Sequence, residues 1–85
     1  MEIKLTSLSD GPVYLQVRQQ VESLIKGGEL ASGDALPSPA SLAAKLSVDR
    51  GEIQRAYYEL EQGGLVQKKT GKDFLGKEKT TYAVK

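Results

Sequence analysis

The residues with the clearest chemical potential are lysines, and they gather toward the carboxyl end of the chain. The protein has 85 residues and carries 12 Lys and Arg against 11 Asp and Glu, a formal net charge of +1. Residues 67–85 alone hold six lysines against two acids, a net charge of +4. These lysines are Lys68, Lys69, Lys72, Lys77, Lys79 and Lys85. Such a cluster binds a polyanion by displacing phosphate counterions, or keeps an edge strand from aggregating by charge repulsion.

Catalytic and metal chemistry find little support in the sequence. The chain has no His and no Cys, which excludes imidazole acid–base catalysis, thiol nucleophiles, zinc fingers and disulfides. A chain of this length also has little room for a substrate pocket beside its core. We therefore expect a protein that is not an enzyme, with no catalytic residue, no metal and no cofactor.

The length and composition are typical of one soluble domain, which we place over residues 1–85. Hydrophobic residues make up 39% and charged residues 27%, ordinary values for a globular chain. No apolar run reaches the about 18–20 residues that a membrane span requires. The first ten residues lack the basic and apolar regions of a signal peptide. We expect a cytoplasmic protein that does not bind membranes.

Three helices are predicted from apolar residues that recur at three- and four-residue steps. They cover about residues 12–26, 39–46 and 50–62, and a Gly-Gly pair directly follows the first and the third. Glycine adopts the left-handed conformation that ends a helix without steric cost. Only two or three residues separate the second helix from the third, which is the tight connection of a helix-turn-helix.

Polar residues at the starts of the second and third helices predict N-terminal caps. Ser38 stands before Pro39, and proline is favoured at the first position of a helix. Asp49 precedes the third helix with Glu52 three residues later, a variant of the capping box. We therefore assign Asp49 and Glu52 to capping and to the helix dipole rather than to ligand binding.

After the third helix the apolar pattern changes to a period of two, which indicates strands. Residues 65–69 and 80–84 are the predicted strands, with Gly71 and Gly76 as turn residues between them. A hairpin over about residues 65–84 behind three helices is the wing of a winged helix-turn-helix. The predicted fold class is therefore mainly α with a small β-hairpin.

Several separate motifs along the chain occur in an order that is specific to one family. They are Pro12 to Val17 in the first helix, Gly28 to Ser38 in the connection, Val48 and Arg50 in the turn, and Ala56, Leu60, Gly64, Leu65 and Val66 at the end of the third helix. Together they cover about residues 3–72. This part of the chain resembles the DNA-binding domain of GntR-type bacterial transcription regulators, and its opening is most similar to the short YtrA-like branch.

The resemblance implies that the third helix lies in the major groove of double-stranded DNA and that the wing touches the minor groove or the backbone. On this basis we assign DNA binding to Ser38, Arg50, Gly51, Gln54, Arg55, Lys68, Lys69, Gly71 and Lys72. Arg50 is suited to donate two parallel hydrogen bonds to a guanine, and Gln54, one turn later, to read an adenine. Arg55 either binds a phosphate or pairs with Glu59 at the i,i+4 spacing. The three lysines are expected to bind phosphates, and the start of the helix after Ser38 offers N–H groups to another.

The sequence departs from the family pattern at several positions. Family members usually carry an acidic residue and then an arginine after Leu-Pro-Ser, where this chain has Pro39 and Ala40. The wing is longer than usual and contains Phe74. We expect no effector domain behind it.

Two hypotheses about function follow. The first is a DNA-binding transcriptional regulator, expected to be a repressor that acts as a homodimer because one small module offers a small contact surface. The second is a winged-helix protein-interaction module that has lost sequence-specific DNA binding and takes a protein partner through the long wing. The second is motivated by Ala40, by the acids Asp49 and Glu52, and by Phe74.

Overall fold

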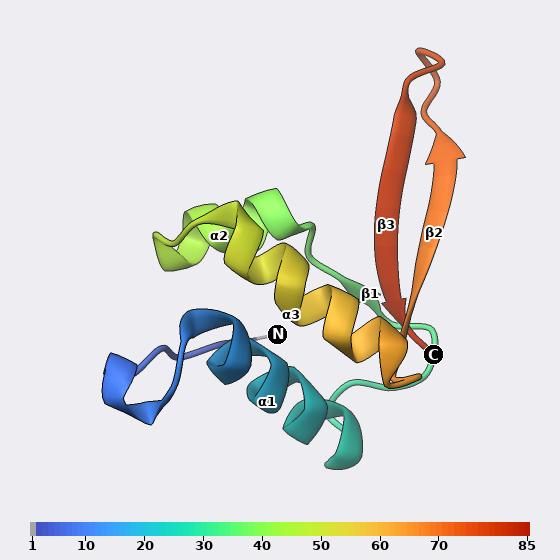
Figure 1. Ribbon diagram of the computed structural model, residues 1–85. Helices are drawn as coiled ribbons and strands as arrows, with labels where there is room; N and C mark the ends of the chain where they lie inside the picture. The colour runs from blue at the N-terminus through green and yellow to red at the C-terminus, as the bar shows by residue number, and fades with distance from the viewer. Residues whose placement is uncertain (1) are drawn as a thin grey trace.

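Three helices and a projecting two-stranded wing make up the fold (Figure 1). The computed structural model describes residues 2–85, with the side chain of residue 8 left out. A short 3-10 helix at Leu8–Asp10 precedes the α-helices. The α-helices are α1 (Val13–Lys26), α2 (Pro39–Leu46) and α3 (Arg50–Gln62), and the strands are β1 (Ala35–Leu36), β2 (Val66–Lys72) and β3 (Glu78–Val84). The predicted fold class is confirmed.

A short strand that the sequence analysis missed ties the wing to the helices. The sheet has the order β1-β3-β2, with both neighbouring pairs antiparallel. Leu36 of β1 pairs with Tyr82 of β3 and is buried. Because only Pro37 and Ser38 separate β1 from α2, this pairing holds the start of α2 beside the base of the wing.

The wing strands extend further than the sequence predicted. Their register runs from Val66 opposite Val84 to Lys72 opposite Glu78, so the tip comprises only residues 73–77. Gly71 lies within β2, and the structure assigns it no positive φ, so its predicted role as a turn residue is wrong. Gly76 is the turn glycine, with φ of 81°. The chain reverses direction only after Lys72, so the strands stay paired up to Lys72 and Glu78.

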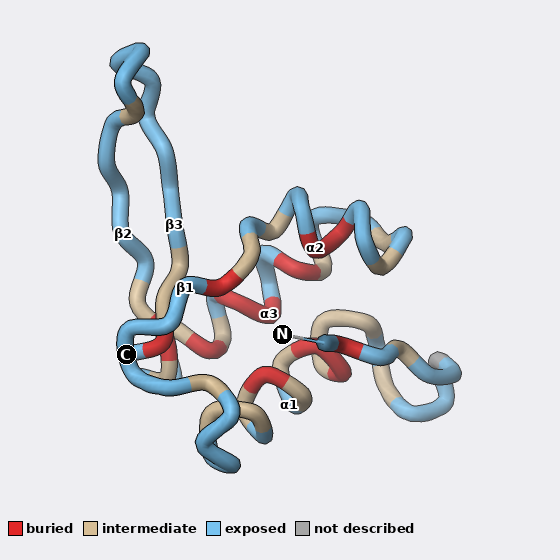
Figure 2. Tube along the Cα trace, turned by 180° about the vertical axis from the view of Figure 1, so that it is seen from behind, coloured by how far each residue is buried: buried red, intermediate tan, exposed pale blue. Residues whose placement is uncertain are grey.

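The core lies where the three helices meet the base of the wing (Figure 2). Its largest fully buried side chains are Tyr57, Ile53, Leu60, Val17, Val21, Val66 and Val84. The Tyr57 hydroxyl donates a hydrogen bond of 2.9 Å to the carbonyl of Pro37, and its ring meets Tyr82 edge-on at 4.9 Å between centroids. Burial, with a smaller contribution from Tyr82, raises the pKa of the Tyr57 hydroxyl, so it remains a neutral donor. Tyr57 thus joins α3 to the segment before α2 and to the wing.

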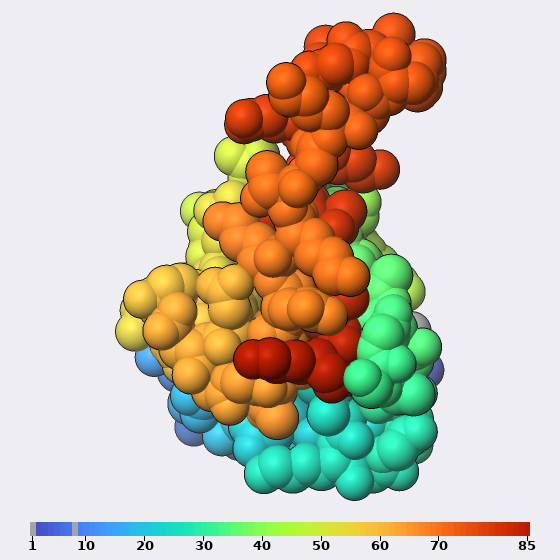
Figure 3. Space-filling view, turned by 90° about the vertical axis from the view of Figure 1, so that its right-hand side faces the viewer, coloured from blue at the N-terminus to red at the C-terminus, as the bar shows by residue number. Residues whose placement is uncertain are grey.

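Beyond its base the wing stands clear of the helices. The molecule measures 43 × 27 × 21 Å along its principal axes, and the wing projects from the body in the space-filling view (Figure 3). Every residue from Lys68 to Thr81 is exposed except the partly buried Asp73. Among residues 2–85, no helix has the length and apolar character needed to cross a membrane.

Candidate nucleic-acid interface

A cleft of about 240 Å³ opens between the N-terminal ends of α2 and α3 and the wing. Its lining residues are Ser38, Pro39, Ala40, Arg50, Gln54, Lys68, Thr80 and Tyr82. Arg50 and Lys68 bring positive charge to the cleft, and none of these lining residues is a carboxylate. Two helix N-termini add the partial positive charge of their unpaired N–H groups. The cleft therefore favours an anionic ligand that accepts hydrogen bonds.

The α2 wall of the cleft begins with a capped helix terminus. Ser38 is the N-cap, and its hydroxyl oxygen accepts a hydrogen bond of 3.1 Å from the N–H of Ser41. This confirms the predicted cap. Pro39 occupies the first helical position, where its missing N–H costs nothing. Ala40 lines the cleft, so the position where family members usually carry an arginine belongs to the same cleft as Arg50 and Lys68.

The α3 wall presents Arg50 and Gln54, one helical turn apart and both exposed. Asp49 caps this helix, with its Oδ1 accepting a 3.0 Å hydrogen bond from the N–H of Gly51. The cap predicted for Asp49 is thereby confirmed. Gly51 contributes its backbone to the cap and lies exposed beside Arg50. The first two turns of α3 therefore present Arg50 and Gln54 to the cleft as exposed polar side chains.

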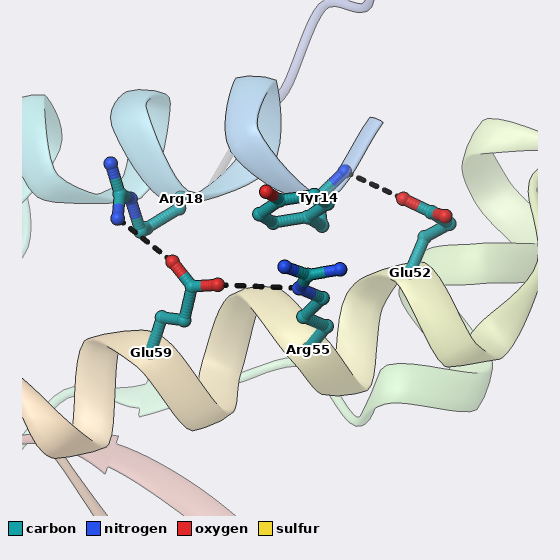
Figure 4. Close-up of polar contacts among 5 residues, drawn as sticks. All are labelled: Tyr14, Arg18, Glu52, Arg55 and Glu59. Carbon is teal, nitrogen blue, oxygen red and sulfur yellow. Dashed lines mark hydrogen bonds and ion pairs between the residues drawn. The ribbon is translucent and has the colours of Figure 1, made fainter. Parts of the chain in front are cut away.

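Glu52 does not complete a capping box on its own helix, and this part of the prediction is wrong. Its Oε2 accepts a 2.9 Å hydrogen bond from the N–H of Tyr14 in the first turn of α1 (Figure 4). The N-cap residue of α1 is Pro12, which makes no side-chain cap bond. Because the start of α1 lies against α3, Glu52 supplies the acceptor that α1 lacks. Its carboxylate is thus directed to α1 and is absent from the lining of the cleft.

Glu59 joins α1 and α3 through two arginines on the same side as Glu52 (Figure 4). Its Oε1 lies 2.8 Å from Nη1 of Arg18, and its Oε2 lies 3.3 Å from Nε of Arg55. The guanidinium of Arg55 also stacks over the ring of Tyr14, 3.8 Å from its centroid. Of the two interpretations of Arg55, the structure contains the i,i+4 pair with Glu59.

The lysines of the wing are divided between its two faces. Side chains alternate along a strand, so Lys68 and Lys72 share the face of Val66, while Lys69 lies on the other face with Gly71. Lys68 reaches the cleft, and all three lysines are exposed. The structure thus brings together four of the predicted residues, Ser38, Arg50, Gln54 and Lys68. It leaves Lys69, Gly71 and Lys72 along the wing, Gly51 at a cap and Arg55 against α1.

The substitution Glu52→Ala is expected to lower the free energy of unfolding by about 1–2 kcal/mol, because α1 loses its cap and a favourable charge at its N-terminus. Urea denaturation followed by circular dichroism measures this change. Glu52→Gln is the matched control, since its amide oxygen can still accept the hydrogen bond from Tyr14. Equal stability of Glu52→Ala and the parent protein would contradict the assignment.

Three helices, a basic wing and a cleft free of lining carboxylates define a winged helix-turn-helix of the DNA-binding class. The chain belongs to the GntR family of bacterial regulatory proteins. The model of this family (Bacterial regulatory proteins, gntR family) matches residues 13–75. This family membership was predicted from the sequence motifs and is confirmed.

Relatives from Bacillus subtilis extend the match beyond the family core. The chain is 37% identical over 71 residues to the uncharacterized HTH-type transcriptional regulator YhcF, covering 84% of this chain and 59% of that protein. It is 33% identical over 70 residues to the HTH-type transcriptional repressor YtrA, covering 82% of this chain and 54% of that protein. The chain therefore spans little more than half the length of these relatives.

Solved structures agree with the fold. YtrA from Sulfolobus acidocaldarius, a GntR-family transcription factor, is 34% identical with a TM-score of 0.75, covering 99% of this chain and 78% of that one. The DNA-binding domain of AraR in complex with operator ORX1 is 22% identical with a TM-score of 0.69, covering 100% and 93% of the two chains. The likeness to AraR concerns the fold alone.

Proposed function

We propose that the protein binds double-stranded DNA and acts as a transcriptional repressor. The observation that carries this proposal is the cleft in which Ser38, Arg50, Gln54 and Lys68 converge without a lining carboxylate. The repressor YtrA of Bacillus subtilis, 33% identical over 70 residues, is the relative that supports it.

In the proposed complex the N-terminal half of α3 enters the major groove. Arg50 donates two hydrogen bonds to a guanine, and Gln54 reads a neighbouring base. The start of α2 at Ser38 and the ammonium group of Lys68 bind phosphates on either side of the cleft. Lys69 and Lys72 contact the backbone further along the wing. Arg55 supports the complex indirectly, by keeping α3 packed on α1.

In this proposal the protein works as a homodimer in the cytoplasm and acts by binding DNA, without catalysis. A single module of this size buries little DNA surface, so two copies on adjacent half-sites supply the affinity that one lacks. Tyr58 of α3, which is 59% exposed, is available to such a contact between copies.

Fluorescence anisotropy of a labelled random-sequence duplex tests the proposal directly. The protein is titrated into the duplex at low and at moderate salt. Phosphate contacts from Lys68, Lys69 and Lys72 and from the α2 terminus predict a log–log salt slope of several units. Absence of binding at high micromolar protein in low salt would overturn the proposal.

The substitution Ala40→Arg is expected to raise DNA affinity by nearly tenfold at about 0.1 M salt. It is also expected to steepen the log–log salt slope by about 0.9, the effect of one added phosphate contact. Ala40 lines the same cleft as the cationic side chains of Arg50 and Lys68, so the new guanidinium would reach the same ligand. Anisotropy at several salt concentrations measures both quantities. Ala31→Arg adds the same charge to an exposed loop outside the cleft and is expected to change neither.

One observation favours a protein partner as the second candidate function. Phe74 at the wing tip is 96% exposed and Leu75 is 67% exposed, which is unusual for neighbouring large apolar residues. One of the two acids that weigh against DNA is directed elsewhere, however, because Glu52 binds α1. DNA binding that is absent, or that does not depend on salt, would favour this second function over the first.

A further inference from the structure

The tip of the wing holds two apolar side chains outward on a tightly bonded turn. Oδ1 of Asp73 accepts hydrogen bonds from the N–H groups of Leu75 at 2.9 Å and of Lys77 at 3.0 Å. The N–H of Gly76 donates to the carbonyl of Asp73 at 3.0 Å. With Phe74 96% and Leu75 67% exposed, the turn presents both side chains to solvent. A turn ordered in advance lowers the entropy cost of inserting these side chains into a partner.

The charge around the tip selects the chemistry of that partner. The two strands and the turn carry the five lysines Lys68, Lys69, Lys72, Lys77 and Lys79. The acids among them are Asp73, which is engaged by the turn, and Glu78. A partner that receives the apolar tip must also accept these ammonium groups along the strands. Duplex DNA has this combination, with phosphates on its outside and apolar stacked bases within.

The length of the wing matches the spacing of DNA grooves. Each strand has seven residues, and at about 3.3 Å per residue it spans roughly 20 Å. Half a turn of B-DNA, the step from a major groove to the next minor groove, is about 17 Å along the axis. Figures 1 and 3 show the wing extending well beyond the helices. A wing of this length is therefore long enough to bridge the step from a major groove that holds α3 to the adjacent minor groove.

We propose that Phe74 and Leu75 form a wedge that enters the minor groove and unstacks a base step, kinking the DNA that α3 holds. The inference rests on the proposed function. Apolar side chains inserted between base pairs bend the duplex toward the major groove, and pyrimidine–purine steps such as TA yield most easily. Lys72 precedes and Lys77 follows the wedge within five residues of chain, so both are near enough to neutralise phosphates at the kinked step.

A duplex rich in TA steps, with 2-aminopurine replacing the adenine of these steps, tests the wedge. Fluorescence of 2-aminopurine rises when its base leaves the stack, and an end label on the same duplex reports binding by anisotropy. The parent protein is compared with the double variant Phe74→Ala/Leu75→Ala. Phe74→Leu keeps an apolar wedge, and Thr81→Ala is a wing control, since Thr81 is exposed and does not line the cleft.

The parent protein, Phe74→Leu and Thr81→Ala are expected to raise 2-aminopurine fluorescence on saturation. The double variant is expected to bind with the same salt slope and to lose most of this rise. If the double variant retains the full rise, or the parent protein binds with no rise, the wedge is overturned while DNA binding stands. The tip is then left to a protein partner. If the parent protein gives no anisotropy change at low salt, the proposed function fails together with the wedge.

Discussion

The triple variant Lys68→Ala/Lys69→Ala/Lys72→Ala is expected to bind random duplex DNA more weakly by on the order of 500-fold at about 0.1 M salt. Its log–log salt slope is expected to be flatter by about 2.7. Each lysine that neutralises one phosphate contributes a slope of about 0.9, which corresponds to nearly tenfold in affinity at that salt concentration. Anisotropy titrations at four or more salt concentrations give both numbers. An unchanged slope would remove the wing from the interface.

The matched control removes three positive charges elsewhere. Lys4 lies in the N-terminal arm, Lys26 ends α1 in an ion pair with Glu22, and Lys85 is exposed beyond the base of the wing. Alanine at these three positions is expected to leave most of the slope intact. Single variants add a geometric test, because Lys68 and Lys69 lie on opposite faces of β2. Equal losses from the two would mean that phosphates contact both faces of the wing, whereas a loss from Lys68 alone would place the DNA on the cleft side.

Alanine at Arg50 is expected to reduce the preference for a selected operator over random DNA by about 1–3 kcal/mol, which is roughly 5- to 150-fold, while non-specific affinity changes little. The reason is geometric, because a guanidinium offers two parallel donors to one guanine and the phosphate contacts lie elsewhere. Competition of the selected site against random duplex measures the ratio. Retention of full preference by Arg50→Ala would mean that α3 does not read bases through this residue.

Two further arginine variants separate charge from geometry. Arg50→Lys keeps the positive charge but loses the planar fork, so it is expected to lose much of the preference as well. Arg55→Ala removes a charge from the same helix on the side that faces α1. A loss of stability with unchanged preference would agree with the ion pair to Glu59, and a loss of preference would restore the alternative role of Arg55 in DNA binding.

The sequence was sufficient to predict a feature where the contact that determines it lies only a few residues away in the chain. Ser38 and Asp49 cap their helices as their types and positions indicated, because a cap needs only an oxygen two or three residues before an unpaired N–H. Tyr57 is fully buried and Tyr58 is exposed, as the helical period requires. The family motifs added the arrangement of the three helices and the wing.

The remainder depends on contacts between residues far apart in the chain. Glu52 stands at a capping-box position, yet its carboxylate binds the N–H of Tyr14 because tertiary packing brings the start of α1 to it. The pairing of β1 with β3 has no local signal, since two residues before a proline carry no period. Gly71 was misassigned because glycine indicates a turn on average, whereas here the hydrogen bonds to Asp73 place the turn further on.

The pairing of Leu36 with Tyr82 also has a consequence for how the protein is made. It joins the middle of the chain to its last strand, and contacts of such large sequence separation are slow to form because a long loop must close first. The three helices end at Gln62, so on the ribosome they are synthesised before β3 exists. The nascent chain thus acquires its helical scaffold early. The cleft, which needs Thr80 and Tyr82 as one of its walls, is assembled only after the final strand has been translated.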